Sequence, residues 1–158
     1  MFDRIIRFLE NAKTEVLAFL SSYTFIITTD KYELIQAPKR AARARGVKLR
    51  YITEITKENF PYCKRQLDMV DELRHLDRIM GNFITSDSEF IVSLDISPEN
   101  PITEGFYSNV DRVVKLNHYV FETFWNYAIS AEIKRSVSSK QDMIASMGLR
   151  RINASHLQ

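Results

Sequence analysis

The segment from Lys31 to Thr53 constrains the fold more than any other part of the chain. Its first part, Tyr32 to Arg45, has the pattern of a basic amphipathic helix, and Gly46 follows it as a helix stop. Next, Val47 to Ile52 alternates apolar and polar residues, as a half-buried strand does. An earlier apolar run, Glu15 to Leu20, predicts another strand. The order strand, helix, strand is typical of an α/β fold with parallel neighbouring strands.

The length of 158 residues and an apolar content of 45% predict one globular domain. We place this domain at residues 1–134 and expect a frayed helix or a disordered tail at 135–158. The single cysteine, Cys63, excludes an internal disulfide and is typical of a reducing compartment. No apolar run approaches the ~20 residues that span a bilayer, and the N-terminus lacks a signal-peptide core, so we expect a cytoplasmic protein without membrane contact.

Periodicity predicts the remaining elements. Further helices are expected at 2–12, at 57–73 with a late start imposed by Pro61, and at 110–133 after a cap at Asn109. Strands are expected at 78–85 and 89–95, joined as a hairpin by 86–88, and a short strand or turn at 105–109. We interpret 23–30 and 96–104 as loops, and Pro38 as a start or break of the helix around it.

The order of these elements, together with the segment 42–52 (ARARGVKLRYI), resembles one repeat of the phospholipase D-like fold over residues 1–134. The resemblance implies a mixed α/β sheet flanked by helices, with a long C-terminal helix. In that family the later hairpin carries a His-x-Lys-x4-Asp motif. If its aspartate is Asp87, the lysine position falls on Asn82 and the histidine position on Met80. A thioether cannot act as the nucleophile and an amide carries no charge for a phosphate, so we expect no catalytic residues.

Shorter segments are similar to the input domains of archaeal, particularly thaumarchaeal, sensor histidine kinases and related regulators. They are residues 50–59, 71–77, 81–83 and 125–132. This resemblance implies a non-catalytic sensory domain in signal transduction, within a two-component system, that binds a small polar ligand or a partner protein such as a histidine kinase.

Two other functions remain open. A phosphodiesterase with an atypical site would need His75 and His118 close to each other. A nucleic-acid-binding regulator would use a basic stretch, but the net charge of +2 is small and we favour a solvated face. That stretch comprises Lys39, Arg40, Arg43, Arg45, Lys48 and Arg50. No set of residues has metal-ligand spacing, and we expect no cofactor.

The carboxyl ends of parallel strands usually form the ligand site of an α/β sheet. Small and hydroxyl-rich side chains stand at two such ends and in the hairpin, where they are suited to a polar ligand. They are Ser21, Ser22, Tyr23, Thr53 and Glu54, with Asn82 and Thr85 from the hairpin. Ordinary capping of strand ends is the alternative explanation.

The predicted helix at 110–133 has an unusually wide apolar stripe. One face carries Val114, His118, Phe121, Trp125 and Ala128, and the adjacent face carries Leu116, Val120, Phe124 and Tyr127. A well-buried core helix explains this pattern. The alternative is a homodimer in which part of the stripe packs on a second copy.

Overall fold

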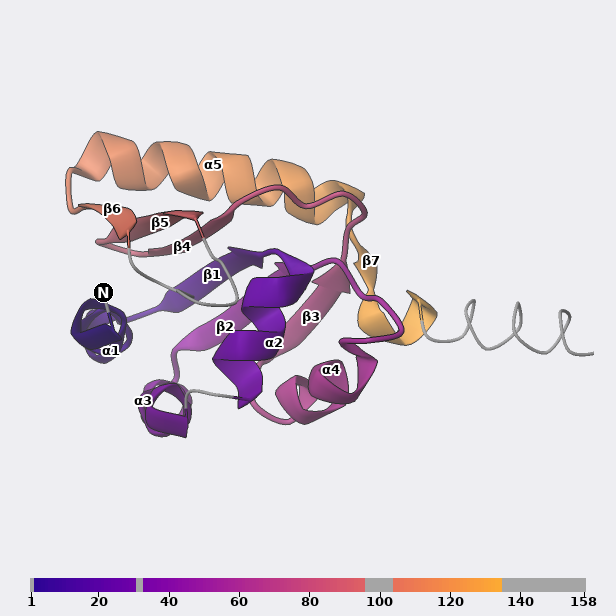
Figure 1. Cartoon of the computed structure of the whole chain (residues 1–158). Helices are drawn as coiled ribbons and strands as arrows, with labels where there is room; N and C mark the ends of the chain where they lie inside the picture. The colour runs from indigo at the N-terminus through magenta and orange to yellow at the C-terminus, as the bar shows by residue number, and fades with distance from the viewer. Residues whose placement is uncertain (1, 31–32, 96–103, 135–158) are drawn as a thin grey trace, which may run out of the picture.

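The computed structural model describes residues 2–30, 33–95 and 104–134 (Figure 1). The described helices are α1 (Phe2–Asn11), α2 (Ser22–Asp30), α3 (Glu33–Ala44), α4 (Phe60–Leu67) and α5 (Asp111–Tyr127). The described strands are β1 (Glu15–Leu20), β2 (Lys48–Thr53), β3 (Glu72–His75), β4 (Asn82–Ser86), β5 (Phe90–Asp95), β6 (Glu104–Ser108) and β7 (Ile129–Ser130).

The strands form one mixed sheet in the order β6-β5-β4-β1-β2-β3-β7. β1, β2 and β3 are parallel, and the other neighbours are antiparallel. The register places Leu20 beside Thr53, and Thr53 beside His75. The predicted α/β class and the parallel pairing of the first two strands are confirmed, and the carboxyl ends of three strands meet at one edge of the sheet.

Helices cover both faces of this sheet (Figure 1). Helices α1 to α4 lie on one face, and α5 crosses the other. Successive residues of β1 pack on opposite faces of the sheet. Val16 belongs to the core under α1 to α4, whereas Leu17 packs with Phe121 and Trp125 of α5. From Val16 to Leu20 the strand is buried on both faces and apolar, which explains why the sequence predicts β1 with its observed bounds.

The interpretation of 23–30 as a loop is wrong, because these residues lie in α2. Ser21 caps this helix, its hydroxyl accepting a hydrogen bond from the Thr24 backbone N–H at 3.3 Å. Inside the helix, Thr28 and Thr29 donate their hydroxyls to main-chain carbonyls one turn earlier, at 2.8 and 2.7 Å. The β-branched residues that resembled a strand are thereby accommodated in a helix.

The predicted start or break at Pro38 is also wrong, since α3 runs through this residue. A proline in a helix removes the hydrogen bond to the carbonyl four residues earlier, here that of Leu34. Leu34 is an exposed residue, so water can satisfy its carbonyl oxygen.

The segment 57–73 was predicted as one helix, but it contains the shorter α4 and the beginning of β3. Val70 and Leu73 are buried, and β3 completes the parallel part of the sheet. The hairpin prediction is confirmed: β4 and β5 pair antiparallel, although β4 begins four residues later than expected, after Gly81 with its positive φ of 94°.

Helix α5 ends at Tyr127 rather than at residue 133. Ala128 is extended, and Ile129–Ser130 forms β7, which pairs with β3 and is the edge strand of the sheet. This pairing competes with the helix and ends it. The predicted cap is wrong as well, because Val110 occupies the cap position. The predicted tail at 135–158 and most of the predicted loop at 96–104 lie outside the described residues.

Candidate functional site at the strand ends

Most of the sequence-predicted site residues lie where the parallel strands end. The backbone N–H of Ser21, directly after β1, donates to Oδ1 of Asn82 at 2.9 Å. Asn82 is the first residue of β4, which runs antiparallel to β1. This contact therefore joins the end of one strand to the start of its neighbour, and it engages the amide oxygen of Asn82.

Asn59 is the centre of the hydrogen bonds at this edge, and it is fully buried. Its Nδ2 donates to the hydroxyl of Ser22 at 2.9 Å and to the carbonyl of Glu54 at 2.7 Å. Its Oδ1 accepts from the Thr56 backbone N–H at 2.8 Å. Sequence reasoning missed Asn59, although the Thr56-x-x-Asn59 spacing of a reciprocal cap precedes α4.

Cys63 lies one turn along α4 from Asn59, with its sulfur 3.6 Å from the Asn59 Oδ1. Burial raises the pKa of the Cys63 thiol to about 12, a rise that a backbone hydrogen bond opposes. The thiol is therefore protonated at neutral pH, which lowers its reactivity toward oxidants.

Thr53 and His75 complete the edge from β2 and β3. Both are buried, and the Thr53 hydroxyl has no hydrogen-bond partner within the described part of the chain. Nδ1 of His75 accepts from the Ile55 backbone N–H at 2.9 Å. Burial, together with the nearby charge of Lys134, lowers the pKa of His75. The remaining ring nitrogen, Nε2, is 3.0 Å from an Asp77 carboxylate oxygen but lacks hydrogen-bond geometry.

Tyr23 and Thr85 are the remaining predicted site residues, and only Tyr23 lies close to the carboxyl ends of the parallel strands. Tyr23 lies half-buried in the first turn of α2, near Ser22 in the chain. Thr85 lies at the far end of β4, where it is paired with Leu17 and its hydroxyl donates to the Glu89 carbonyl at 3.3 Å. The structure therefore gathers the predicted residues at one edge, except for Thr85.

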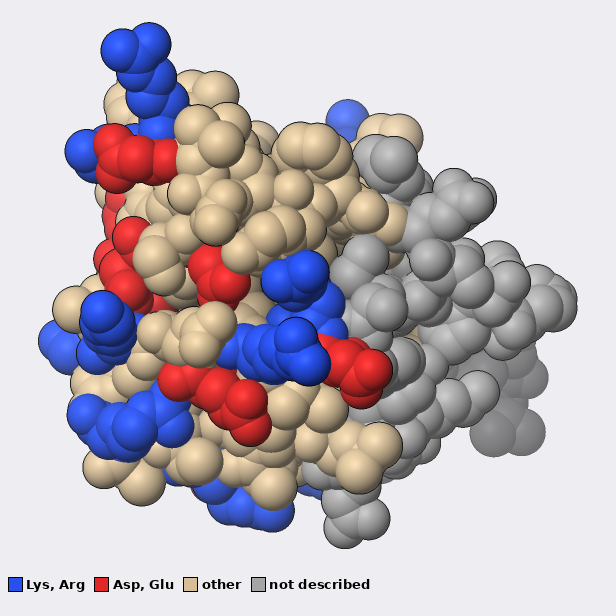
Figure 2. All heavy atoms as spheres, turned by 90° about the vertical axis from the view of Figure 1, so that its left-hand side faces the viewer, with Lys and Arg blue, Asp and Glu red and all other residues tan. Residues whose placement is uncertain are grey.

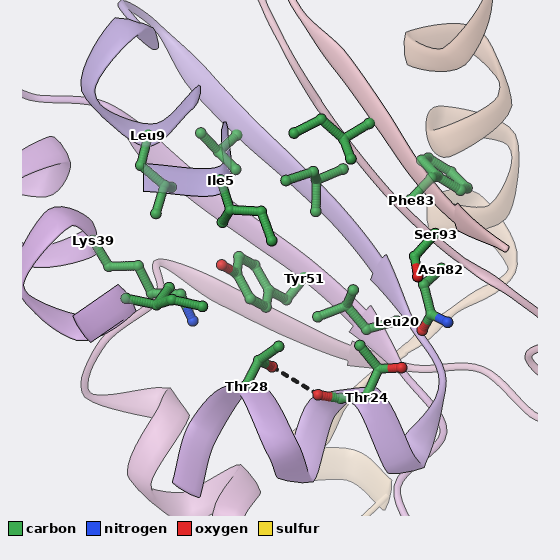
Figure 3. Close-up of a pocket in the computed structure, with 14 residues that line it drawn as sticks. Ile5, Leu9, Leu20, Thr24, Thr28, Lys39, Tyr51, Asn82, Phe83 and Ser93 are labelled. Carbon is green, nitrogen blue, oxygen red and sulfur yellow. Dashed lines mark hydrogen bonds between the residues drawn. The ribbon is translucent and has the colours of Figure 1, made fainter. Parts of the chain in front are cut away.

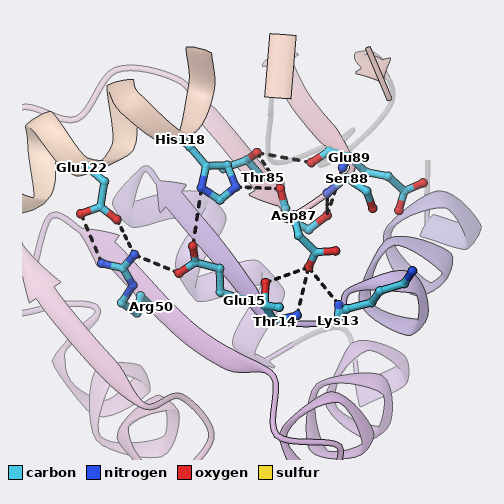
Figure 4. A network of polar contacts seen from close by, with 11 residues as sticks. Lys13, Thr14, Glu15, Arg50, Thr85, Asp87, Ser88, Glu89, His118 and Glu122 are labelled. Atoms are coloured by element: carbon cyan, nitrogen blue, oxygen red, sulfur yellow. Dashed lines mark hydrogen bonds and ion pairs between the residues drawn. The ribbon is translucent and has the colours of Figure 1, made fainter. Parts of the chain in front are cut away.

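A second polar cluster occupies the opposite edge of the sheet (Figure 4). Arg50 of β2 forms ion pairs with Glu15 of β1, at 2.9 Å, and with Glu122 of α5. His118 of α5 contacts the Ser86 carbonyl through Nε2, at 2.7 Å, and its Nδ1 is 3.6 Å from Glu15. These contacts fasten α5 to the sheet.

Asp87, in the β4–β5 turn, belongs to the same edge. Its Oδ1 accepts backbone hydrogen bonds from Lys13 and Thr14, at 2.9 and 3.0 Å, and lies 3.3 Å from the Thr14 hydroxyl. Partial burial raises the pKa of Asp87, but these hydrogen bonds outweigh that effect, so its pKa lies below the ordinary value. The carboxylate joins the hairpin turn to the segment that leads into β1.

The two interior histidines lie at opposite edges of the sheet. His75 stands at the carboxyl end of β3, whereas His118 contacts Glu15 and Ser86 at the amino end of β1. Six residues of β1 separate these edges, a length of about 17 Å at roughly 3.3 Å per residue. Met80, close to the His75 edge in sequence, is 92% exposed.

Three residues of the basic stretch, Arg43, Arg45 and Arg50, have partners within the chain. Arg43 bonds to the Asp68 carbonyl and pairs with Asp71 at 3.2 Å. Arg45 donates to the carbonyl oxygens of Leu9 and Glu10. On the side of the molecule that carries α1, basic side chains alternate with acidic ones and form no continuous patch (Figure 2).

Searches of the described residues for other site types are negative. No three His, Cys, Asp or Glu side chains in 2–30, 33–95 and 104–134 come together as a possible metal site. Within the same ranges, every helix is too short or too polar to cross a lipid bilayer.

Comparisons with known proteins identify the fold. No family model and no curated protein sequence matches the chain. Among solved structures, it is similar to TrmBL2, described as an archaeal chromatin protein with a novel mode of DNA binding, with a TM-score of 0.61 and 24% identity over 81% of this chain. The chain spans about half of TrmBL2, 49% of its length. It is also similar to Nuc of Salmonella typhimurium, a phospholipase D family member, with a TM-score of 0.61 and 12% identity over 82% of this chain and 89% of Nuc. The chain has the phospholipase D-like fold.

Proposed function

We propose that this chain is a non-catalytic recognition domain that serves regulation or signal transduction. The observation that carries the proposal is which residues lie at the strand-end edge, where the carboxyl ends of β1, β2 and β3 meet. At the two positions that would hold the family's histidine and lysine, the chain has an exposed thioether, Met80, and an amide, Asn82, whose oxygen already bonds to Ser21. Neither supplies a nucleophile or a positive charge for a phosphate.

The positions of the histidines support the same proposal. A phosphodiesterase of this type needs two imidazoles on opposite sides of one phosphorus atom. His75 and His118 are at opposite edges, and each has a structural contact, to Ile55 and to Ser86 respectively.

The test is hydrolysis of bis(p-nitrophenyl) phosphate by the full chain, with an active phosphodiesterase as the positive control. We expect no turnover above the buffer rate, and the same result for His75→Asn and His118→Asn. Turnover that either substitution abolishes would contradict the proposal and favour the phosphodiesterase alternative.

A sensory role would place a polar ligand at the strand-end edge, at Ser21, Ser22, Tyr23, Thr53, Glu54 and Asn82. A thermal-shift screen of nucleotides and phosphorylated metabolites tests this. A ligand at a hundredfold excess over Kd stabilises the fold by about 2.7 kcal/mol. Ser22→Ala should remove the shift, and Thr85→Ser, at the far end of β4, should retain it. A shift that survives Ser22→Ala would place the ligand elsewhere.

Helix α5 offers the surface for self-association. Its predicted inner face is buried at Val114, Phe121 and Trp125, but Leu116, Tyr119 and Tyr127 are exposed. We propose that a second copy packs on this outer face, and that a histidine kinase or another signalling protein is an alternative occupant. Light scattering of Tyr127→Glu should show a smaller species than the unaltered chain, and equal masses would contradict a homodimer.

Nucleic-acid binding is the second candidate, and the DNA-binding title of TrmBL2 is the observation that favours it. The internal contacts of Arg43, Arg45 and Arg50 weigh against it, because paired guanidinium groups are not available to phosphates. A gel shift with duplex DNA that weakens steeply with salt would favour DNA binding, and we expect none.

A further inference from the structure

A cavity of about 70 Å³ lies between the sheet and the helices α1, α2 and α3 (Figure 3). One water needs roughly 10–15 Å³ in the same measure, so the space suits a molecule of several heavy atoms. Most of the wall is apolar. It includes Ile5 and Leu9 of α1, Leu20 of β1, Ile35 of α3, Ile84 of β4 and Ile91 of β5.

One amine lies in this apolar surrounding. Lys39 of α3 is 3% exposed, and its Nζ lies 4.9 Å from the centre of the Tyr51 ring (Figure 3). Within the described residues, Nζ has neither a hydrogen-bond partner nor a carboxylate within 4.0 Å. A buried ammonium without a counter-ion is costly, and a single aromatic face offsets only part of that cost.

A second polar group lies at the other end of the cavity. The hydroxyl of Ser93, on β5, is buried and also lacks a hydrogen-bond partner among the described residues. The hydroxyl of Thr28 is less available to a ligand, because it already donates a hydrogen bond to the Thr24 carbonyl. The cavity therefore presents one cationic group, extensive hydrocarbon and a small number of polar groups, which also include the Tyr51 phenol and the Asn82 amide.

These features select the chemistry of an occupant. A phosphate or a sugar needs many donors and would leave its polar atoms against isoleucine and leucine. A carboxylate needs one cation, and a short hydrocarbon tail matches the walls. We propose that this cavity binds a short-chain monocarboxylate, with its carboxylate on Nζ of Lys39 and its tail among Ile5, Leu20 and Ile84. The volume suits a chain of roughly three to five carbon atoms.

The cavity wall shares Asn82 with the strand-end edge, but it includes neither Met80 nor a histidine, so this inference does not depend on the absence of phosphodiesterase activity. The phosphodiester assay and the carboxylate assay therefore fail or succeed separately.

The first experiment measures proton uptake when sodium butyrate binds the full chain. Burial lowers the pKa of Lys39 to about 7, so most of the amine is neutral at pH 8. Tyr51 is the other titratable residue of the described lining, and burial raises its pKa, which keeps it protonated at this pH. Calorimetry at pH 8 in two buffers of different ionisation enthalpy should give close to one proton taken up per butyrate. Butanol, which has a similar shape and no charge, should bind with no uptake.

The second experiment changes the lysine. Lys39→Met should weaken butyrate binding at least tenfold and leave butanol binding unchanged. Lys48→Met, at an exposed position of β2, is the matched control and should bind as the unaltered chain does. Equal affinities for butyrate in Lys39→Met and the unaltered chain would overturn the proposal, as would butyrate binding without proton uptake. Absence of butyrate binding at about 50 mM would also overturn it. The proton count uses the unaltered chain alone, so it decides the matter even if Lys39→Met does not fold.

Discussion

The carboxylate of Asp87 accepts a hydrogen bond from the backbone N–H of Lys13 at 2.9 Å, across 74 residues of sequence. A second bond from Thr14 strengthens the same link. The position that would be the aspartate of a phosphodiesterase motif therefore has a structural task, which is to hold the β4–β5 turn against the entry to β1.

Asp87→Ala should lower the free energy of unfolding by about 2 kcal/mol at pH 7, because it leaves two backbone donors without their acceptor. The difference in the free energy of unfolding between Asp87→Ala and the unaltered chain should be smaller in acid. The pKa of Asp87 is lowered in the folded state, so the stability from its charge is present above pH ~4, the unfolded-state value, and is lost as the pH falls through the folded-state pKa. Urea unfolding, followed by the fluorescence of the single Trp125, measures this at pH 7 and in acid. Asp68→Ala, at an exposed helix end, should have almost no effect.

Because Lys39 is buried, the free energy of unfolding should increase as the pH rises from 7 to 9. The pKa of Lys39 is about 7 in the folded state and about 10.5 when unfolded, so the unfolded chain holds more protons over this interval. Stability should rise by about 2 kcal/mol between pH 7 and 9. Above pH 9 the raised pKa of Cys63 opposes the trend, since the unfolded thiol loses its proton first. Urea unfolding of Lys39→Met should lack the rise, and an unchanged pH profile would contradict a buried, unpaired amine.

Arg50 and Glu122 should be energetically coupled. The ion pair links β2 to α5, and Arg50 also lies 5.1 Å from the Trp125 ring centre. Arg50→Met should cost about 2 kcal/mol, because it leaves the carboxylates of Glu15 and Glu122 without a cation. A double-mutant cycle with Glu122→Gln should give a coupling of about 1 kcal/mol.

The matched control is Lys115 and Asp111, a pair four residues apart on α5 and exposed at both ends. Its coupling should not exceed about 0.5 kcal/mol. Equal couplings for the two pairs would mean that Arg50 is no more than a surface charge.

Asn59→Ala should be the most damaging substitution at the strand-end edge. It removes the partners of Ser22, Glu54 and Thr56 from a fully buried position, and we expect a loss of roughly 3 kcal/mol. Asn117→Ala removes a single side-chain bond, to the Val113 carbonyl, and should cost less than about 1 kcal/mol. Chemical unfolding compares the two, and a similar small loss at Asn59 would show that its network is dispensable.

The sequence allowed accurate prediction where burial is strong and local. β1 has its predicted bounds because both of its faces are covered. β3 and β7 were missed because four and two residues carry too little periodicity, and their pairing depends on residues far away in the chain. The contact between Ser21 and Asn82 agrees with the prediction that strand ends meet, whereas Thr85 lies at the other end of an antiparallel strand.

The burial of Lys39 could not be predicted from the number of charges in the sequence. Lys39 belongs to a basic stretch, and its burial was not predicted. The signal was its spacing, since Ile35, Lys39 and Ala42 recur at helical intervals and all three are buried. A lysine within an apolar stripe deserves to be treated as a candidate interior residue.

The short strand β7 determines how the domain responds to a pull from its C-terminal side. Only two residue pairs, Arg74 with Ser130 and His75 with Ile129, join it to β3. A load on Lys134 would reach these pairs before it reached α5, and it would open them one after the other. The domain would thus yield first at β7. The guanidinium of Arg74, a residue of one of these pairs, lies 4.1 Å from the centre of the Trp125 ring, so the opening would become visible as a change in fluorescence.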